Sequence, residues 1–213
     1  MKKNKPILKD KKSTFIDKSV IFGKGVIVYE NCRIEGNTEI EDGAVIMPDC
    51  YIKDCKIGKN SVVFKSVCES ATVKENCYVG PFARLRPNAV ICDGAKIGNF
   101  VEIKNAVIGK GSKVNHLAYV GDAEIGENCN IGCGVIFVNY NGKIKQKSIV
   151  KDNCFIGSNC NIIAPVVIED NSYICAGTTV TKDVKNGDFV IGRVRQEVKE
   201  NLAKKYLKEF KGE

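Results

Sequence analysis

Aliphatic residues recur at every sixth position over most of this chain, and a small residue follows each of them four places later. An α-helix requires apolar recurrence near 3.6 residues, and a half-buried strand requires it near 2. A sustained period of six therefore predicts short strands separated by tight corners, three of which make one triangular coil. The clearest blocks have the aliphatic members Phe22, Val28, Ile34, Ile40 and Ile46, then Val73, Val79, Leu85, Ile91 and Ile97, and then Ile156, Ile162, Ile168 and Ile174.

Gly, Asn and Asp cluster just after the aliphatic positions, as in residues 57–60 and 108–111, where the chain must turn sharply. From about Ile16 to Lys185 the pattern predicts roughly nine coils stacked at the spacing of parallel strands. We therefore expect an all-β domain of parallel coils over residues 15–186. A basic segment, residues 1–14, precedes it, and a tail, residues 187–213, follows it.

The repeat is interrupted at several places, which matters because function usually resides in departures from a scaffold. One-residue skips follow Ile52, Ile103 and Val120, and the register is irregular between residues 63 and 73. A longer insertion, residues 139–147, contains an Asn-Gly turn signal and is too polar for a wall strand. We expect this insertion to project as a loop.

The tail carries apolar residues at intervals of four among Lys and Glu, namely Val198, Leu202, Tyr206 and Phe210. This spacing predicts a short amphipathic C-terminal helix within residues 195–211. Such a helix packs against the prism or a neighbouring chain, or else contacts a ligand directly. The sequence leaves both roles open.

The formal charge of +8 suggests nucleic acid at first sight, but it comes from the two ends of the chain. Residues 1–12 contribute +5 and residues 193–213 contribute +3, so the body is balanced and shows no basic groove with interleaved aromatics. No stretch approaches the roughly 18 apolar residues of a membrane span, and no apolar signal region follows the first lysines. We expect a cytoplasmic protein with no nucleic-acid or membrane partner.

The 11 cysteines are expected to be free thiols, because nothing in the sequence indicates an oxidising compartment. There is no C-x-x-C pair and only one histidine, so no metal site is expected. Most cysteines stand at the small corner position of the repeat, where a thiol acts as a compact apolar filler. Cys92, Cys133 and Cys175 stand elsewhere, and of these Cys133 stays a candidate for function.

Polar residues that could carry chemistry are concentrated between Arg84 and Lys147, many of them about one coil apart. Several cations beside a histidine would suit a substrate that bears a phosphate and reacts at its other end. His116 is third in its hexad, where the side chain should point outward, so it is either an idle surface residue or a base. No Ser or Cys stands close to it in sequence, so an acyl-enzyme has no specific support.

Longer motifs in the same region carry a resemblance that is more specific than the repeat. The chain resembles the C-terminal acetyltransferase domain of the bifunctional N-acetylglucosamine-1-phosphate uridylyltransferase and glucosamine-1-phosphate N-acetyltransferase family, over about residues 15–195 and most densely over 79–195. The motifs are GPFARLRP at 80–87, GNFVEIK at 98–104, GKGSK at 109–113, HLAYVGDAEIG at 116–126, NIG at 130–132, NYNG at 139–142, APV at 164–166 and AGTTVT at 176–181.

The resemblance implies a left-handed parallel β-helix of hexapeptide repeats that forms a homotrimer. It implies transfer of the acetyl group of acetyl-CoA, a co-substrate, to the amine of the sugar phosphate glucosamine 1-phosphate, for synthesis of UDP-N-acetylglucosamine. His116 matches the general base and Asn130 the asparagine beside the reacting centre, and Glu102 is expected to orient the histidine ring. The positions matching sugar-phosphate binders are Arg86, Lys104, Tyr119, Asn139, Tyr140 and Lys145. Those matching acetyl-CoA contacts are Cys133, Ser158, Ala176 and Arg193.

This sequence departs from the family at three positions. The family usually has Asp where this chain has Asn141, Ala where it has Cys133 and Ser where it has Gly192. The Leu-x-x-Gly-x-Gly-Thr-x-Met signature of its nucleotidyltransferase half is absent from this sequence, so uridylyl transfer is not expected. Two alternatives stay open. One is an acyltransferase acting on a nucleotide-linked or other amino sugar or on serine, and the other is a non-catalytic trimerising partner of a separate uridylyltransferase chain.

Overall fold

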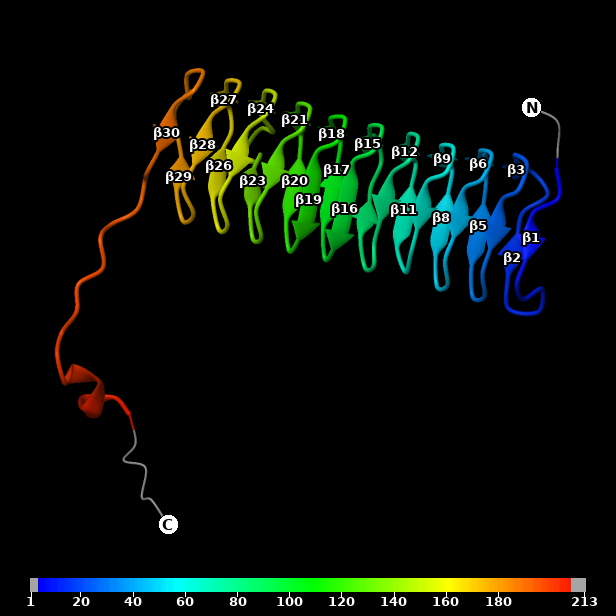
Figure 1. The fold of residues 1–213 in the computed structure, drawn as a ribbon, viewed down its shortest axis with the longest axis horizontal. Coiled ribbons are helices and arrows are strands. Elements are labelled where there is room, and N and C mark those ends of the chain that lie inside the picture. The colour runs from blue at the N-terminus through cyan, green and yellow to red at the C-terminus, as the bar shows by residue number, and fades with distance from the viewer. Residues whose placement is uncertain (1–3, 208–213) are drawn as a thin grey trace, which may run out of the picture.

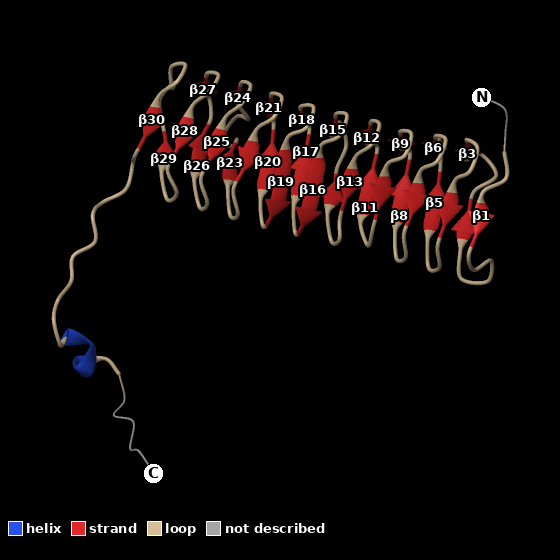
Figure 2. Ribbon diagram, viewed as in Figure 1, coloured by secondary structure: helices blue, strands red, loops and turns tan. Residues whose placement is uncertain are grey.

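Three walls of short parallel strands close into a triangular prism that runs along the long axis of the molecule (Figure 1). The structure is a computed structural model that describes residues 4–207, the side chain of Lys204 excepted. Strands that neighbour one another in a wall lie one coil apart in the chain. Figure 2 shows the strands alternating with tight loops at the corners. The predicted parallel β-helix is therefore confirmed.

Wall A has 11 strands: β1 Ile7–Leu8, β4 Ile27–Val28, β7 Val45–Ile46, β10 Val62–Val63, β13 Tyr78–Val79, β16 Lys96–Asn99, β19 Lys113–His116, β22 Asn130–Ile131, β25 Phe155–Ile156, β28 Tyr173–Ile174 and β30 Phe189–Val190. Wall B has 10: β2 Phe15–Ile16, β5 Arg33–Glu35, β8 Tyr51–Lys53, β11 Val67–Glu69, β14 Arg84–Leu85, β17 Glu102–Lys104, β20 Tyr119–Gly121, β23 Ile136–Val138, β26 Asn161–Ile163 and β29 Thr179–Val180. Wall C has 9: β3 Ile21–Phe22, β6 Glu39–Ile40, β9 Lys56–Ile57, β12 Thr72–Val73, β15 Val90–Ile91, β18 Val107–Ile108, β21 Ala123–Ile125, β24 Ser148–Val150 and β27 Val167–Ile168.

The core is the set of residues that the period of six selects. The aliphatic members, for example Ile34, Ile97 and Ile103, are fully buried inside the prism, and so are small corner residues such as Ala44 and Ala95. Each aliphatic residue stacks on its equivalent in the next coil, because parallel strands lie about 4.8 Å apart. Burial of these stacked rows is the main force that closes the prism.

Coils differ in length, and this decides which residues become neighbours. Hydrogen-bonded residues in successive coils are separated by 17 or 18 positions over most of the chain, and by 25 across the coil that contains residues 139–147. The predicted skips are real, because Ile108 is the next buried aliphatic residue after Ile103 and lies five positions on.

The prism extends further at both ends than the sequence pattern predicted. β1 lies within the segment predicted to precede the domain and pairs with β4, and β30 lies within the predicted tail and pairs with β28. The chain therefore forms about ten coils instead of about nine. Two-residue strands at the ends have too little sequence pattern to be recognised, and they form because an open sheet edge offers them partners.

The tail contains less helix than predicted. Its only helical segment among the described residues is the 3₁₀ turn η1 Leu202–Lys205, which lies away from the prism (Figure 1). Val198 and Tyr206 are each 74% exposed, so the apolar stripe has nothing to pack against in the single chain. A short helix without such packing is marginal in water. Phe210, the fourth residue of the predicted stripe, lies outside the described residues.

The cysteines are free, and all but Cys92 and Cys133 are buried. Cys32, Cys50 and Cys129 occupy the corner positions that the repeat predicted for filler residues. Burial raises the pKa of the Cys55 thiol to about 11 and also raises that of Cys68, which keeps both in the unreactive thiol form. The interpretation of corner cysteines as core filler is confirmed by this burial.

We expect Ile103→Ala to lower the free energy of unfolding by about 2–5 kcal/mol, because the coils above and below hold the walls apart and cannot fill the cavity. The matched control is Val198→Ala in the exposed tail, which should change the free energy of unfolding by less than about 0.5 kcal/mol. Urea unfolding followed by circular dichroism measures both. Similar losses in the two variants would contradict the assignment of the core.

Candidate functional site

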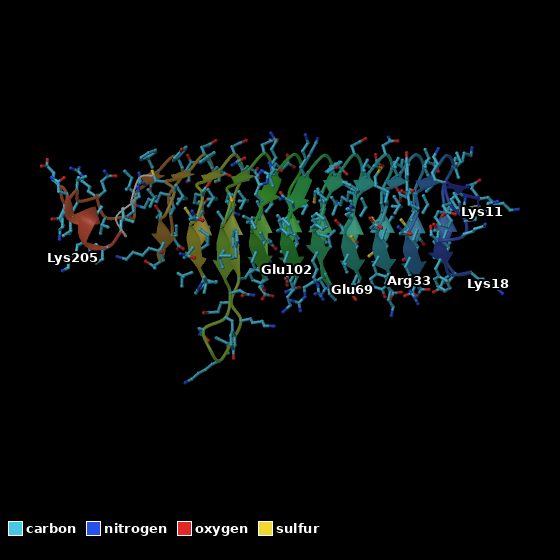
Figure 3. All side chains as sticks on the ribbon, turned by 90° about the horizontal axis from the view of Figure 1, so that it is seen from below. Lys11, Lys18, Arg33, Glu69, Glu102 and Lys205 are labelled. Carbon is cyan, nitrogen blue, oxygen red and sulfur yellow. The ribbon has the colours of Figure 1, made fainter. Side chains whose placement is uncertain are left out.

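Most of the residues predicted to carry chemistry gather at the edge between walls A and B and across the outer face of wall B. His116 ends β19 in wall A, and Tyr119 begins β20 in wall B three residues later. Glu102, in β17 one coil before, lies along one side of the prism in a row with Glu69 and Arg33 (Figure 3). These elements place polar side chains outward because the alternate positions fill the core.

His116 is exposed, as its place in the hexad predicted. Its Nδ1 lies 2.7 Å from Oδ1 of Asn99, which is the paired residue one coil before it. The strands that carry the two residues, β16 and β19, each have four residues and continue the wall A pairing up to the corner. The imidazole is thus presented to solvent at the edge and held on one side only.

Three of the four predicted acetyl-CoA positions stack above His116 along the same edge. The backbone N–H groups of the following coils donate to the carbonyl oxygens of His116, Cys133 and Ser158, at 3.4, 2.8 and 2.8 Å, so these residues succeed one another coil by coil. Ala176 directly precedes Gly177, the donor to Ser158, and is therefore next in the column. The guanidinium of Arg193 then donates to the carbonyl of Ala176 at 3.2 Å. The structure therefore places all four residues in one line that leads to His116.

Glu102 does not contact the His116 ring, contrary to the expectation from the resemblance. Its carboxylate instead accepts a hydrogen bond from Arg86 Nη1 at 2.7 Å, with both side chains about one third exposed. This contact raises the pKa of Arg86. Parallel pairing explains the difference, because Glu102 faces Tyr119 across the strands, three residues beyond His116.

Lys104 and Lys145 are brought together on the far side of wall B. Lys104 ends β17, and Lys145 comes from the loop of residues 139–147. The nearby ammonium group of Lys145, and with smaller effect the Arg86 guanidinium, lowers the pKa of Lys104. Like charges held close together in this way have a net attraction for an anion, and a phosphate would remove their mutual repulsion.

Asp122 anchors the base of this loop and was missed by sequence reasoning. Its carboxylate accepts hydrogen bonds from the amide of Asn105, at 2.6 Å, and from that of Asn139. Burial on its own would raise the pKa of Asp122, but these two hydrogen bonds outweigh it, and the charges of Lys104 and Lys145 act in the same direction. The pKa of Asp122 is therefore lowered overall. The sequence did contain a signal for this contact, because Asp122 lies 17 residues, one coil, from each of the two asparagines.

The loop itself projects from the prism, as predicted (Figure 3). Tyr140 forms an antiparallel bridge with Lys145, and its hydroxyl donates to the carbonyl of Gly142 at 2.7 Å. The side-chain oxygen of Asn141 accepts from the backbone N–H groups of Lys143 and Ile144, at 3.0 and 2.9 Å. An aspartate, which the family usually has here, could accept the same two bonds, so this departure preserves the turn.

Tyr119 lies across its own strand, where its ring covers the backbone of Gly121. A Cβ at Gly121 would overlap the Tyr119 ring, so only glycine leaves room for it. The ring is half-buried in this position, and its strand lies between those of Glu102 and Ile136. The sequence predicts that Tyr119 belongs to the site, but it gave no reason for the neighbouring glycine.

Asn130 is the predicted site residue that the single chain does not bring to His116. It begins β22 on the outer face of wall A, where its backbone pairs with Lys113 and Phe155. His116 lies three residues beyond Lys113, so roughly 10 Å of strand separates the two positions. Within one chain, Asn130 and His116 therefore lie apart along the same wall.

A cavity of about 350 Å³ lies beneath the loop, between Asn105, Asp122 and Lys145 to Lys147. It includes Lys145 but not His116, so it does not enclose the predicted reacting centre. Among residues 4–207 no group of three or more His, Cys, Asp or Glu side chains is placed to hold a metal ion. In the same range no helix has the length and apolar character needed to cross a bilayer.

Comparison with known proteins connects this geometry to a family. Residues 67–137 match the family model described as the GMPPB C-terminal domain, and residues 147–182 match the bacterial transferase hexapeptide model of six repeats. The bifunctional protein GlmU of Clostridioides difficile strain 630 is 47% identical over 196 residues, which cover 92% of this chain and 43% of that protein. GlmU of Clostridium novyi strain NT is 48% identical over 200 residues, covering 93% and 44%.

This chain is a homologue of the C-terminal part of GlmU. It spans less than half the length of these curated relatives. The Arabidopsis UDP-N-acetylglucosamine acyltransferase shares the fold with a TM-score of 0.61 at 19% identity, over 83% of this chain and 68% of that one. LpxA of Bacteroides fragilis, also a UDP-N-acetylglucosamine acyltransferase, has a TM-score of 0.53 at 19% identity, over 81% and 67%.

Two departures of this GlmU homologue from the family lie in the column above His116. Gly192 donates its N–H to Thr178 Oγ1 at 3.1 Å, and a Cβ at this position would lie 2.8 Å from the Thr178 methyl group. The usual serine would therefore require Thr178 to move. Cys133 is one of the two cysteines that are not buried, so its thiol borders the column next to the histidine.

Proposed function

We propose that this chain transfers the acetyl group of acetyl-CoA to the amine of glucosamine 1-phosphate. The observation that carries the proposal is the single column formed by Cys133, Ser158, Ala176 and Arg193, which ends at His116. Three inter-coil spacings of about 4.8 Å give this column a length of about 14 Å from His116 to Ala176. Such a long and narrow track suits an extended pantetheine arm whose thioester lies beside the histidine.

Arg86, Lys104 and Lys145 form the cation cluster across wall B, and they suit the phosphate of the acceptor. The amine, on the ring carbon next to the one that bears the phosphate, then lies toward the edge that carries His116. In the reaction, the amine nitrogen attacks the thioester carbonyl and loses a proton to His116. The new C–N bond forms as the C–S bond breaks, and the leaving CoA thiolate takes up a proton.

The direct test is acetyl-CoA consumption with a panel of amino sugars, with and without a 1-phosphate. Turnover that is fastest with glucosamine 1-phosphate supports the proposal. Preference for a nucleotide-linked amino sugar or for serine would assign the alternative acyltransferase activity instead. No turnover on any acceptor would leave a non-catalytic assembly role, because the fold alone does not specify chemistry.

We further propose that the functional unit is a homotrimer with sites between copies. Asn130 lies on wall A and the cation cluster lies on wall B, so one chain does not assemble both around His116. A second copy whose wall A faces the wall B of the first would bring Asn130 to the reacting centre. A cyclic arrangement of this kind repeats the same contact three times.

A complementation experiment tests this arrangement. His116→Ala and Asn130→Ala should each be nearly inactive alone, and trimers assembled at random from equal amounts of the two should regain about a quarter of the wild-type rate. Sedimentation should show three copies per particle. Mixed trimers that stay as inactive as their parents, or a fully active monomer at assay concentration, would contradict shared sites.

A further inference from the structure

The neighbour of His116 is a single asparagine. Asn99 and His116 are paired residues of adjacent parallel strands, so their side chains leave the edge side by side. The Asn99 Oδ1 atom lies 2.7 Å from His116 Nδ1, and this is the only hydrogen bond of the imidazole within the described residues. Asn99 is half-buried while His116 is exposed, so the asparagine is the more fixed member of the pair.

The orientation of the Asn99 amide, with its oxygen toward the ring, favours one position of the imidazole proton. A carboxamide oxygen only accepts hydrogen bonds, so the nitrogen that faces it must be a donor. A neutral imidazole has one N–H, so a proton on Nδ1 leaves the lone pair on Nε2. Nε2 is the nitrogen directed away from Asn99 and free to accept a proton from a bound amine.

We infer that Asn99 is a positioning residue for the reaction: it holds the His116 ring in the Nδ1–H tautomer, with Nε2 as the basic nitrogen. The inference rests on the proposed function in one respect, the use of His116 as the base. The sequence pointed to Glu102 for this role, but that carboxylate is paired with Arg86.

The chain contains one histidine, which makes a direct test possible. Protein labelled with ¹⁵N-histidine gives the two ring-nitrogen signals of His116 alone, without any dependence on acetyl transfer. Above the pH at which the ring titrates, we expect Nδ1 to carry the proton in the wild type. In Asn99→Ala we expect a shift toward the Nε2–H form that unconstrained histidines favour. Asn99→Asp keeps an acceptor at the same place and should restore the Nδ1–H form.

Kinetics provide the second readout. Loss of a partner that orients a functional histidine typically costs about 10–100-fold, so kcat of Asn99→Ala should fall by that factor while KM for acetyl-CoA changes little. Asn99→Asp should recover most of the loss. The matched control is Asn115→Ala, which removes the asparagine directly before His116. Asn115 makes no side-chain hydrogen bond among the residues described, and its loss should change neither the tautomer nor kcat.

Each outcome decides one question. A wild-type ring in the Nε2–H form, or an Asn99→Ala protein that keeps the Nδ1–H form and a kcat within about threefold of wild type, overturns the role of Asn99. If Asn99→Ala does not fold, the tautomer of the wild-type ring still decides it: the Nδ1–H form supports the role of Asn99 and the Nε2–H form overturns it. Full activity in His116→Ala would instead overturn the use of His116 as the base, while the tautomer result would stand by itself.

Discussion

His116→Ala is expected to lower kcat by about 10²–10⁴-fold and to leave the melting temperature nearly unchanged. In the proposed reaction the sugar amine must lose a proton as it attacks the thioester, and a positioned base contributes a rate factor of that size. The ring is exposed at the end of β19 and makes its one described hydrogen bond to Asn99, so its removal leaves the core intact. Steady-state kinetics on the folded protein measure the effect.

The matched control for this experiment is Lys113→Ala, which changes an exposed residue at the start of the same strand. Its kcat should stay close to that of the wild type. A His116→Ala protein that is folded and trimeric, with kcat within about threefold of wild type, would show that His116 is an idle surface residue. The mechanism proposed above would then be wrong.

Replacing any one of Arg86, Lys104 and Lys145 with alanine should lower kcat/KM for glucosamine 1-phosphate by about 10–100-fold. Each charge-assisted contact to a phosphate contributes about 1.5–3 kcal/mol, which corresponds to that range. The loss with glucosamine, which has no phosphate, should be small. The contrast between the two acceptors is the measurement, because a general disturbance of the site would reduce both rates equally.

Arg86 requires an additional control, because its removal leaves the Glu102 carboxylate without its partner. The uncompensated negative charge would itself repel a phosphate, so part of the loss in Arg86→Ala should be recovered in the Arg86→Ala, Glu102→Ala double variant. Lys96→Ala, on the exposed face of wall A, is the matched control for loss of a cation and should behave as wild type. An equal loss on both acceptors would contradict a phosphate-specific role.

The repeat alone was sufficient to predict the scaffold. The six-residue period identified the buried residues, and a five-residue step after Ile103 was enough to locate a shortened corner before Ile108. This succeeds because each hexad has the same local task, to bury one aliphatic side chain and turn sharply after it. The hand of the coil came from the resemblance, since the period of six is the same for either hand.

The contacts of the site depended on tertiary structure. Sequence reasoning selected the residues of the edge column and the cation cluster, but it assigned Glu102 to His116 and overlooked both Asn99 and Asp122. Which residues become neighbours depends on the length of the coil between them, here 17 residues for both the Asn99–His116 and the Asn139–Asp122 contacts. Side chains three residues apart in one coil, such as His116 and Tyr119, belong to different walls.

The sequence by itself thus determined the three-walled coil, its core and the identity of most polar residues on its surface. Only the tertiary structure decided which of them meet, Asn99 with His116 and Glu102 with Arg86, and which stay apart, as Asn130 does from His116. The physical reason is that burial of apolar side chains is a local and periodic requirement, readable position by position. A polar contact instead depends on the exact stacking of separate coils, which small changes in coil length shift from one residue to the next.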